Sequence, residues 1–306
     1  MTTFWLAVTA VVNAQSVAPV ASGNHLLASA LDALDWHVSI TARIRHQSRL
    51  GEHTLTGSGN YWQRGTGEKR VSKWEMQTQV AGKTASFVQV FDGDYLWTDR
   101  QLPSGRKVLR LDVKLLQLRL DPASQEPEQS VTTSLDAARS QGGLAQMLAD
   151  LMQRFEFDSP RQTQLNGLAV YALMGHWRRE ELAALGVDLD PQDDAETIPW
   201  PTQLPHHVLV LLGREKLFPY VIEYRRASDA YLLDTVAGLR PTRDPLVRYE
   251  IFGVQFTQVI DPSVFQYKPG DLQWTDETSL VIERLRKQQE IAAEKLAGRV
   301  ADGDTR

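Results

Sequence analysis

The chain has 306 residues, 42% of them apolar and 23% charged, which is enough to bury the core of one large domain or two small ones. The formal net charge of −5 argues against a nucleic-acid partner, because phosphate binding needs a basic surface. The sequence contains no cysteine, which excludes disulfides, a cysteine nucleophile and a lipid anchor carried on cysteine.

The first residues predict a secretory signal. Residues 4–12 (FWLAVTAVV) form an apolar run, and Val12-Asn13-Ala14 follows the pattern of a cleavage site. We therefore expect a cleaved signal over residues 1–14 and a periplasmic or otherwise secreted protein without a membrane anchor. No Lys or Arg precedes the apolar run, so the alternative is an N-terminus that is disordered or buried in the fold.

The first half of the chain predicts one helix followed by a meander of strands. Leucines at helical spacing indicate a helix over His25–Leu34. From Val38 to Leu111 apolar and polar residues alternate with a period of two, starting with Val38 on the apolar face. Asp92-Gly93 is a strong hairpin signal within this stretch, and Gly65-Thr66-Gly67 marks another turn. We therefore expect about six antiparallel strands here.

The second half predicts further helices and strands. Leu144–Phe155 favours a helix because its apolar residues form one broad stripe. Thr275–Leu296 predicts a final helix, with Thr275 or Asp276 as its cap. Two polar, proline-containing excursions occupy residues 121–143 and 186–205. The strands expected between these segments are Arg161–Leu165, Leu168–Arg179, His206–Leu212, Tyr220–Arg226 and Arg248–Ile260.

This order of elements predicts an α+β fold. Strands that follow one another as hairpins indicate a single antiparallel sheet, of roughly eleven strands in this case. A long, twisted sheet curls into a half-barrel, and we expect the helices to pack on its concave face. We assign residues 15–276 to this half-barrel domain and residues 277–306 to a long C-terminal helical extension.

Three segments, taken in their order, resemble the LolA/LolB family of outer-membrane lipoprotein carriers. They are the FDGDYLW turn and strand at Phe91–Trp97, the helix at Leu144–Phe155, and the tail at Val259–Gly270 that ends in FQYKPG. The resemblance implies an apolar cavity between sheet and helices that takes acyl chains, with the helix at Leu144–Phe155 as its lid. It also implies a lipid or acylated protein as cargo, and a membrane-associated donor or acceptor protein as partner.

Apolar residues of the strands and of the lid helix are the candidates for the lining of such a cavity. They are Trp74, Met76, Tyr95, Trp97, Leu148, Leu151, Leu209 and Leu211. The alternative is a solid core, because cavity linings and cores have similar compositions. Besides the non-enzymatic carrier, two functions therefore remain open: an interaction protein with a solid core, and a hydrolase with a scattered site.

Charged and metal-binding side chains give weaker signals. Arg43, Arg45 and Arg49 share one strand face, which indicates either a docking patch for an acidic partner or lipid headgroups, or the solvated convex face. His206 and His207 are adjacent on a strand, so they point to opposite faces and cannot chelate one metal without a bulge. The sequence has no Gly-x-Ser-x-Gly elbow. We expect no metal, no cofactor and no enzymatic activity, and the oligomeric state is left open.

Overall fold

The computed structural model describes residues 22–51, 53–80, 82–120, 142–187, 200–201, 204–226, 231–234, 238–241, 245–287 and 290. The expected signal over residues 1–14 lies outside the described residues. The same holds for most of the two excursions and for the end of the C-terminal extension.

The first half of the described chain is one helix followed by six strands. Helix α1 (Gly23–Trp36) is capped by Ser22, whose Oγ accepts a hydrogen bond of 3.2 Å from the His25 N–H. At the Asp92-Gly93 turn, the Asp92 carboxylate accepts from the N–H groups of Asp94 and Tyr95. The strands are β1 (Ser39–Leu50), β2 (His53–Arg64), β3 (Val71–Val80), β4 (Lys83–Phe91), β5 (Tyr95–Leu102) and β6 (Gly105–Asp112), and a 3-10 turn, η1 (Gly67–Lys69), joins β2 to β3.

The second half supplies the remaining helices and strands. The helices are α2 (Val113–Leu120), α4 (Gly143–Arg154), α5 (Arg179–Ala184) and the 3-10 turn η3 (Pro262–Phe265). The strands are β7 (Phe155–Phe157), β8 (Arg161–Leu165), β9 (Leu168–Trp177), β10 (His207–Gly213), β11 (Pro219–Arg225), β12 (Tyr231–Asp234), β13 (Gly238–Pro241), β14 (Val247–Gln255) and β15 (Thr275–Asp276).

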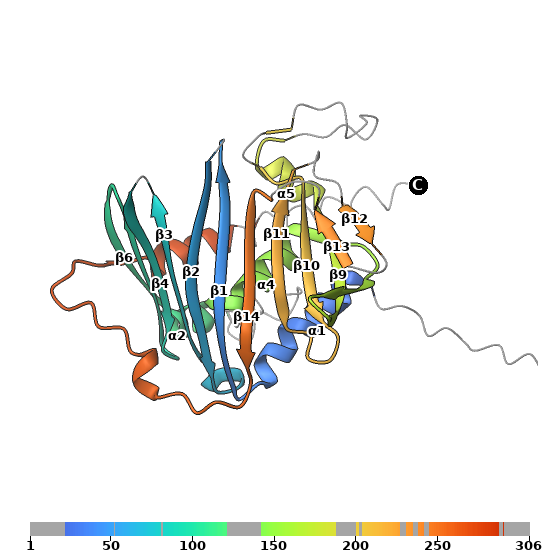
Figure 1. Ribbon diagram of the computed structural model, residues 1–306. Coiled ribbons are helices and arrows are strands. Elements are labelled where there is room, and N and C mark those ends of the chain that lie inside the picture. Colours follow the sequence, from blue (N-terminus) through green and yellow to red (C-terminus); the bar gives the residue numbers. More distant parts are fainter. Residues whose placement is uncertain are drawn as a thin grey trace, which may run out of the picture.

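One open, curled sheet of 13 strands organises these elements (Figure 1). Its order is β15-β6-β5-β4-β3-β2-β1-β14-β11-β10-β9-β7, with β8 paired to β9. The two halves of the chain join where β1 pairs with β14, for example Ile44 with Ile251. The predicted α+β half-barrel is confirmed, with a sheet that is mixed because β15 runs parallel to β6.

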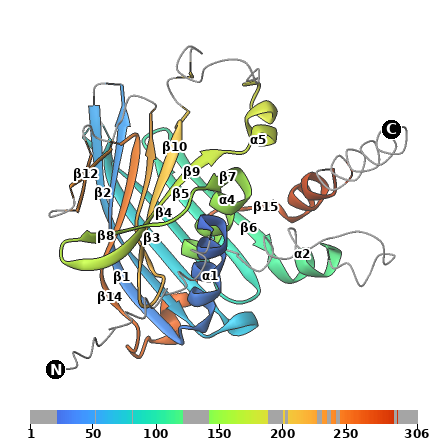
Figure 2. The ribbon, with the colours of Figure 1, turned by 90° about the vertical axis from the view of Figure 1, so that its right-hand side faces the viewer.

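Helices α1 and α4 pack against the same, inner face of the sheet (Figure 2). Each presents an apolar stripe at helical spacing, and Leu27 and Leu34 of α1 are fully buried, as are Leu144 and Leu148 of α4. These side chains meet inward-facing residues of β1, β3, β9, β10, β11 and β14 in one large core. Among the described residues no helix is both long and apolar enough to span a bilayer.

Three details of the predicted elements are corrected. The final helix starts at residue 278, because Thr275–Asp276 pairs with β6; Asp276 Oδ1 still accepts a hydrogen bond of 2.9 Å from the Thr278 N–H. Phe155 opens strand β7 instead of ending the helix, since Phe155–Phe157 pairs with β9. The short hairpin β12–β13 was not predicted.

Candidate functional site

Helix α4 enters the inner face through two glycines in the left-handed region. The φ angles of Gly142 and Gly143 are 84° and 62°, values that side chains other than glycine adopt at a cost. A Cβ atom on Gly143 would lie 2.8 Å from Cε2 of Tyr61 on β2. The Gly143 N–H donates a hydrogen bond of 2.8 Å to the Gln89 side-chain oxygen on β4. The start of α4 is therefore held closely against the sheet.

The other end of α4 runs without a loop into the sheet. Arg154 is the last helical residue and Phe155 is the first residue of β7, which pairs with β9. The backbone of Arg178 donates to the Arg154 carbonyl at 2.8 Å, and the Arg178 Nε atom donates to the Met152 carbonyl at 3.4 Å. The C-terminal end of α4 is thus anchored by backbone pairing, whereas side chains of the sheet hold its N-terminal end, among them Gln89.

Four of the predicted cavity residues meet where α4 packs against the sheet. Trp74, Met76, Leu148 and Leu151 belong to one core cluster, in which the two leucines are 0% and 1% exposed. The strand register brings Trp74 opposite Tyr61, and their rings meet edge to face with centroids 5.9 Å apart. The inner face is therefore apolar and closely covered in this structure.

A short polar chain crosses this core. The Tyr61 hydroxyl donates to Gln63 Oε1 at 2.6 Å, and Gln63 Nε2 donates to the Leu34 carbonyl at 2.6 Å. Burial raises the pKa of Tyr61 far above its ordinary value, so the phenol stays protonated and keeps its donor. These bonds satisfy buried polar groups and tie the end of α1 to β2.

Tyr95 and Trp97 lie on the outer face of the sheet, away from the other candidates. Trp74 pairs with Gln89, which pairs with Thr98, so Trp97 points to the opposite side. There Trp97 packs with Val90 and Val108. The expectation that Trp97 converges with Leu148 is therefore wrong, because strand alternation places the two on different faces of the sheet.

Leu209 and Leu211 also lie on the outer face. They pack with Val170, Ala172 and Val221, whereas Val208, Val210 and Leu212 of the same strand face the core under the helices. All seven residues of β10 are buried. A strand that is covered on both faces has no polar side, so its apolar composition could not indicate which leucines face inward.

The arginines of β1 lie on the outer face as well. Arg43 and Arg45 are exposed and Arg49 is half-buried. Arg45 forms an ion pair of 3.2 Å with Glu250, and its guanidinium carbon lies 5.2 Å from the centroid of the Phe252 ring. A docking patch over these three arginines stays a prediction.

The histidines provide no metal site in the described part of the chain. His206 stacks edge to face with Trp200, with centroids 4.8 Å apart, and the ring of His207 lies 6.5 Å from that of His176. Among the described residues no three His, Asp or Glu side chains are grouped so that they could hold a metal ion.

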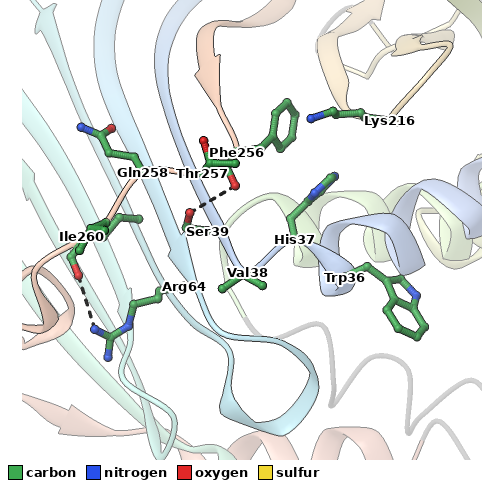
Figure 3. A pocket seen from close by; sticks show the side chains of 11 residues that line it. Trp36, His37, Val38, Ser39, Arg64, Lys216, Phe256, Thr257, Gln258 and Ile260 are labelled. Atoms are coloured by element: carbon green, nitrogen blue, oxygen red, sulfur yellow. Dashed lines mark hydrogen bonds between the residues drawn. The ribbon is translucent and has the colours of Figure 1, made fainter.

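A pocket that the sequence did not predict lies where α1 leads into β1 and where the chain leaves β14 (Figure 3). Its volume is about 630 Å³. Its lining comprises Trp36, His37, Val38, Ser39, Arg64, Lys216, Phe256, Thr257, Gln258, Val259 and Ile260.

Three apolar side chains of this pocket stand out into solvent: Trp36 is 81% exposed, Val38 is 69% exposed and Val259 is 96% exposed. The expected burial of Val38 is thus wrong, because β1 begins one residue later and the alternation does not extend back to it. The signal for this pocket in the sequence was Trp36 and Val38 on either side of His37, between the end of a helix and the start of a strand.

Cationic side chains border the same pocket. The Lys216 Nζ atom lies 4.0 Å from the centroid of the Phe256 ring, on which the His37 ring packs at 4.4 Å. Arg64 donates a hydrogen bond of 3.4 Å to the Ile260 carbonyl. Burial, with a smaller contribution from the Lys216 charge, lowers the pKa of His37, which favours its neutral form.

No protein-family model and no curated protein matches the sequence. Solved structures do. A chain of the Pseudomonas aeruginosa MucA/MucB complex aligns with 80% of this chain at 10% identity and a TM-score of 0.39, and the alignment spans 61% of that chain. A DUF1329 family protein from Desulfovibrio piger aligns with 81% of this chain and 98% of its own, at 11% identity and a TM-score of 0.35.

A LolA superfamily protein from Nitrosomonas europaea is similar too. It aligns with 81% of this chain and 98% of its own, at 13% identity and a TM-score of 0.29. At these identities and TM-scores the likeness carries no statement about family, ligand or partner.

Proposed function

We propose that this chain is an extracytoplasmic, non-enzymatic carrier that holds an acyl chain of a lipid or acylated protein between the inner face of its sheet and helix α4. One observation carries the proposal. The apolar inner face is covered by a helix that continues into the sheet at its C-terminal end and begins at two glycines in the left-handed region, Gly142 and Gly143, at its N-terminal end.

A bound acyl chain could offset the cost of opening such a lid, because its apolar contacts would replace those of α4. If α4 swung outward, Trp74, Met76 and Leu148 would lose their cover, at a cost of about 25 cal/mol for each Å² of apolar surface exposed. An acyl chain in the gap would restore that cover and bury its own methylenes, each contributing about 0.8 kcal/mol. Opening would therefore be unfavourable in water and offset in the presence of a ligand.

The side chains around α4 are suited to repacking. Met76 belongs to the core cluster, and Met147 and Met152 of α4 pack against it, so that three of the five methionines of the chain gather here. Methionine is unbranched and adapts to irregular apolar shapes. These residues could follow the contour of an acyl chain where leucine or valine would resist.

The test combines binding with a distance measurement. The chain contains no cysteine, so pairs of introduced cysteines can be spin-labelled selectively. We expect Arg43→Cys with Gln146→Cys, near the start of α4, to report a longer distance after addition of oleic acid. The control pair, Arg43→Cys with Gln153→Cys near the anchored end, should change much less. Displacement of a fluorescent fatty acid, and native mass spectrometry of gently purified protein, measure binding itself.

A second function is favoured by one specific observation, the close covering of the inner face. Leu148 and Leu151 are buried as completely as any core residue, which is also what an interaction protein with a solid core would show. Such a protein would bind no fatty acid, would retain no lipid after purification, and would keep both labelled distances unchanged. That combination of results would replace the carrier with the interaction protein.

A further inference from the structure

The exposed apolar side chains at the pocket of Figure 3 form a surface that the carrier function does not use. Trp36 and Val38 flank the end of α1, and Val259 comes from the segment after β14, so two distant parts of the chain contribute. With exposures of 81%, 69% and 96%, these side chains protrude and are not shielded by pocket walls. Exposed apolar side chains that gather in this way indicate a surface that binds a membrane or another molecule.

The charge of this surface is opposite in sign to that of the chain. Lys216 and Arg64 belong to the lining, which contains no carboxylate, whereas the chain as a whole carries −5. Three carboxylates adjoin lining residues in the sequence. Asp35 pairs with Arg70, Glu215 is exposed beside Lys216, and Asp261 accepts a hydrogen bond of 2.9 Å from the Ser263 N–H at the start of η3. Cations beside exposed apolar side chains match a surface that is anionic at its boundary and apolar below.

We propose that Trp36, Val38, Val259, Lys216 and Arg64 form a docking surface for an anionic lipid bilayer. Tryptophan suits the boundary between headgroups and acyl chains, because its ring is apolar and its N–H is polar. Val38 and Val259 would enter the apolar layer beside it, and Lys216 and Arg64 would meet phosphate groups. A deep, enclosed site for a single small ligand would instead have shielded the two valines.

This surface is independent of the acyl site beneath α4, because none of its five residues belongs to the core cluster there. If the protein does not bind vesicles, the carrier proposal is unaffected. If it does not bind fatty acid, the proposed membrane-docking surface is unaffected. The two measurements use different probes, so their outcomes can be told apart.

The experiment is co-sedimentation of the full chain with vesicles. We expect binding to vesicles that contain phosphatidylglycerol, weaker binding to phosphatidylcholine alone, and release at high salt. Lys216→Gln should reduce binding to the anionic vesicles about fivefold. The double variant Trp36→Ser with Val259→Ser should reduce binding to the anionic vesicles by at least about tenfold.

Matched controls lie elsewhere on the surface. Lys83→Gln removes an exposed lysine and Leu185→Ser removes a leucine that is 55% exposed, and neither should change vesicle binding. Thermal unfolding would verify that all variants fold. The absence of binding by the parent protein, or an equal loss in the control variants, would overturn the proposal; the first result would leave this surface to a protein partner.

Discussion

Trp97 on β5 packs edge to face against Trp274 near the C-terminal end of the described chain, with 5.6 Å between the ring centroids. The guanidinium carbon of Arg110 lies 4.2 Å from the centroid of the Trp274 ring, and Tyr267 packs on Trp97 at 5.3 Å. The segment that precedes β15 therefore crosses the outer face of β5 and β6. It covers apolar side chains that would otherwise be exposed on that face.

Trp74 lies on the inner face of the sheet and Trp97 on the outer face, so variants of these two residues probe the two faces. Both are buried, so Trp74→Ala and Trp97→Ala should each lower the free energy of unfolding by about 3–5 kcal/mol. Only Trp74→Ala should weaken fatty-acid binding, because only Trp74 lies beneath α4. Urea unfolding and displacement of a fluorescent fatty acid measure the two effects. Equal binding losses in both variants would contradict the assignment of the site to the inner face.

The sequence was sufficient for most of the elements but not for all of their faces. The period of two in β1–β6 and the stripe of α4 predicted strands and helix correctly, since both patterns are local. The outward position of Trp97 also follows from the Asp92-Gly93 turn, which sets Phe91 opposite Leu96 and so Val90 opposite Trp97. Counting through this register would have separated Trp97 from Trp74.

Other features depend on contacts between distant segments, which no local pattern contains. The pairing of β1 with β14 and the parallel pairing of β15 with β6 are of this kind. The pocket at Trp36 and Val259 is another, because its two halves are brought together by the pairing of β1 with β14. Such features could not be predicted from residue spacing.

The segment that precedes β15 and crosses the outer face should also give the protein an acid-sensitive contact. Arg106 bonds both carboxylate oxygens of Asp99, at 2.9 and 2.6 Å, and Tyr267 donates its hydroxyl to Asp99 at 2.9 Å. Hydrogen bonding from Arg106 is the largest effect, and it lowers the pKa of Asp99 below its ordinary value. The carboxylate therefore stabilises the fold above a pH of about 4, and this contribution is lost as the pH falls through its lowered pKa.

Asp99→Asn tests this contact. The variant should be less stable than the parent at pH 7, and the difference should shrink toward pH 3, as measured by urea unfolding at each pH. Asp271→Asn, at an exposed position, serves as the control and should follow the parent at both values. A difference between Asp99→Asn and the parent that stays constant over this range would show that protonation of Asp99 is not coupled to folding.

The first glycine of α4 should be sensitive to a single methyl group. Gly143→Ala forces alanine to a φ of 62° and places its Cβ atom 2.8 Å from the Tyr61 ring. Gly67→Ala is the matched control, because Gly67 has a φ of 55° and no atom within 4 Å of the added Cβ. We expect the control to cost about 1–2 kcal/mol through the left-handed backbone alone. Gly143→Ala should cost more, and equal losses in thermal unfolding would show that the contact with Tyr61 relaxes freely.

Replacement of Leu148 by a larger residue distinguishes a movable lid from a solid core. Leu148 on α4 and Leu173 on β9 are both fully buried in the same cluster, but Leu173 sits on a strand that is paired on both sides. Leu173→Trp should lower the free energy of unfolding by about 1–3 kcal/mol or more, because the strand cannot retreat. If α4 shifts outward as proposed, Leu148→Trp should cost clearly less, and the added ring should fill the proposed acyl site and reduce fatty-acid binding. Urea unfolding and displacement of a fluorescent fatty acid again provide the measurements. If both substitutions destabilise equally and the parent binds no fatty acid, helix α4 is a fixed part of a solid core and the carrier function is excluded.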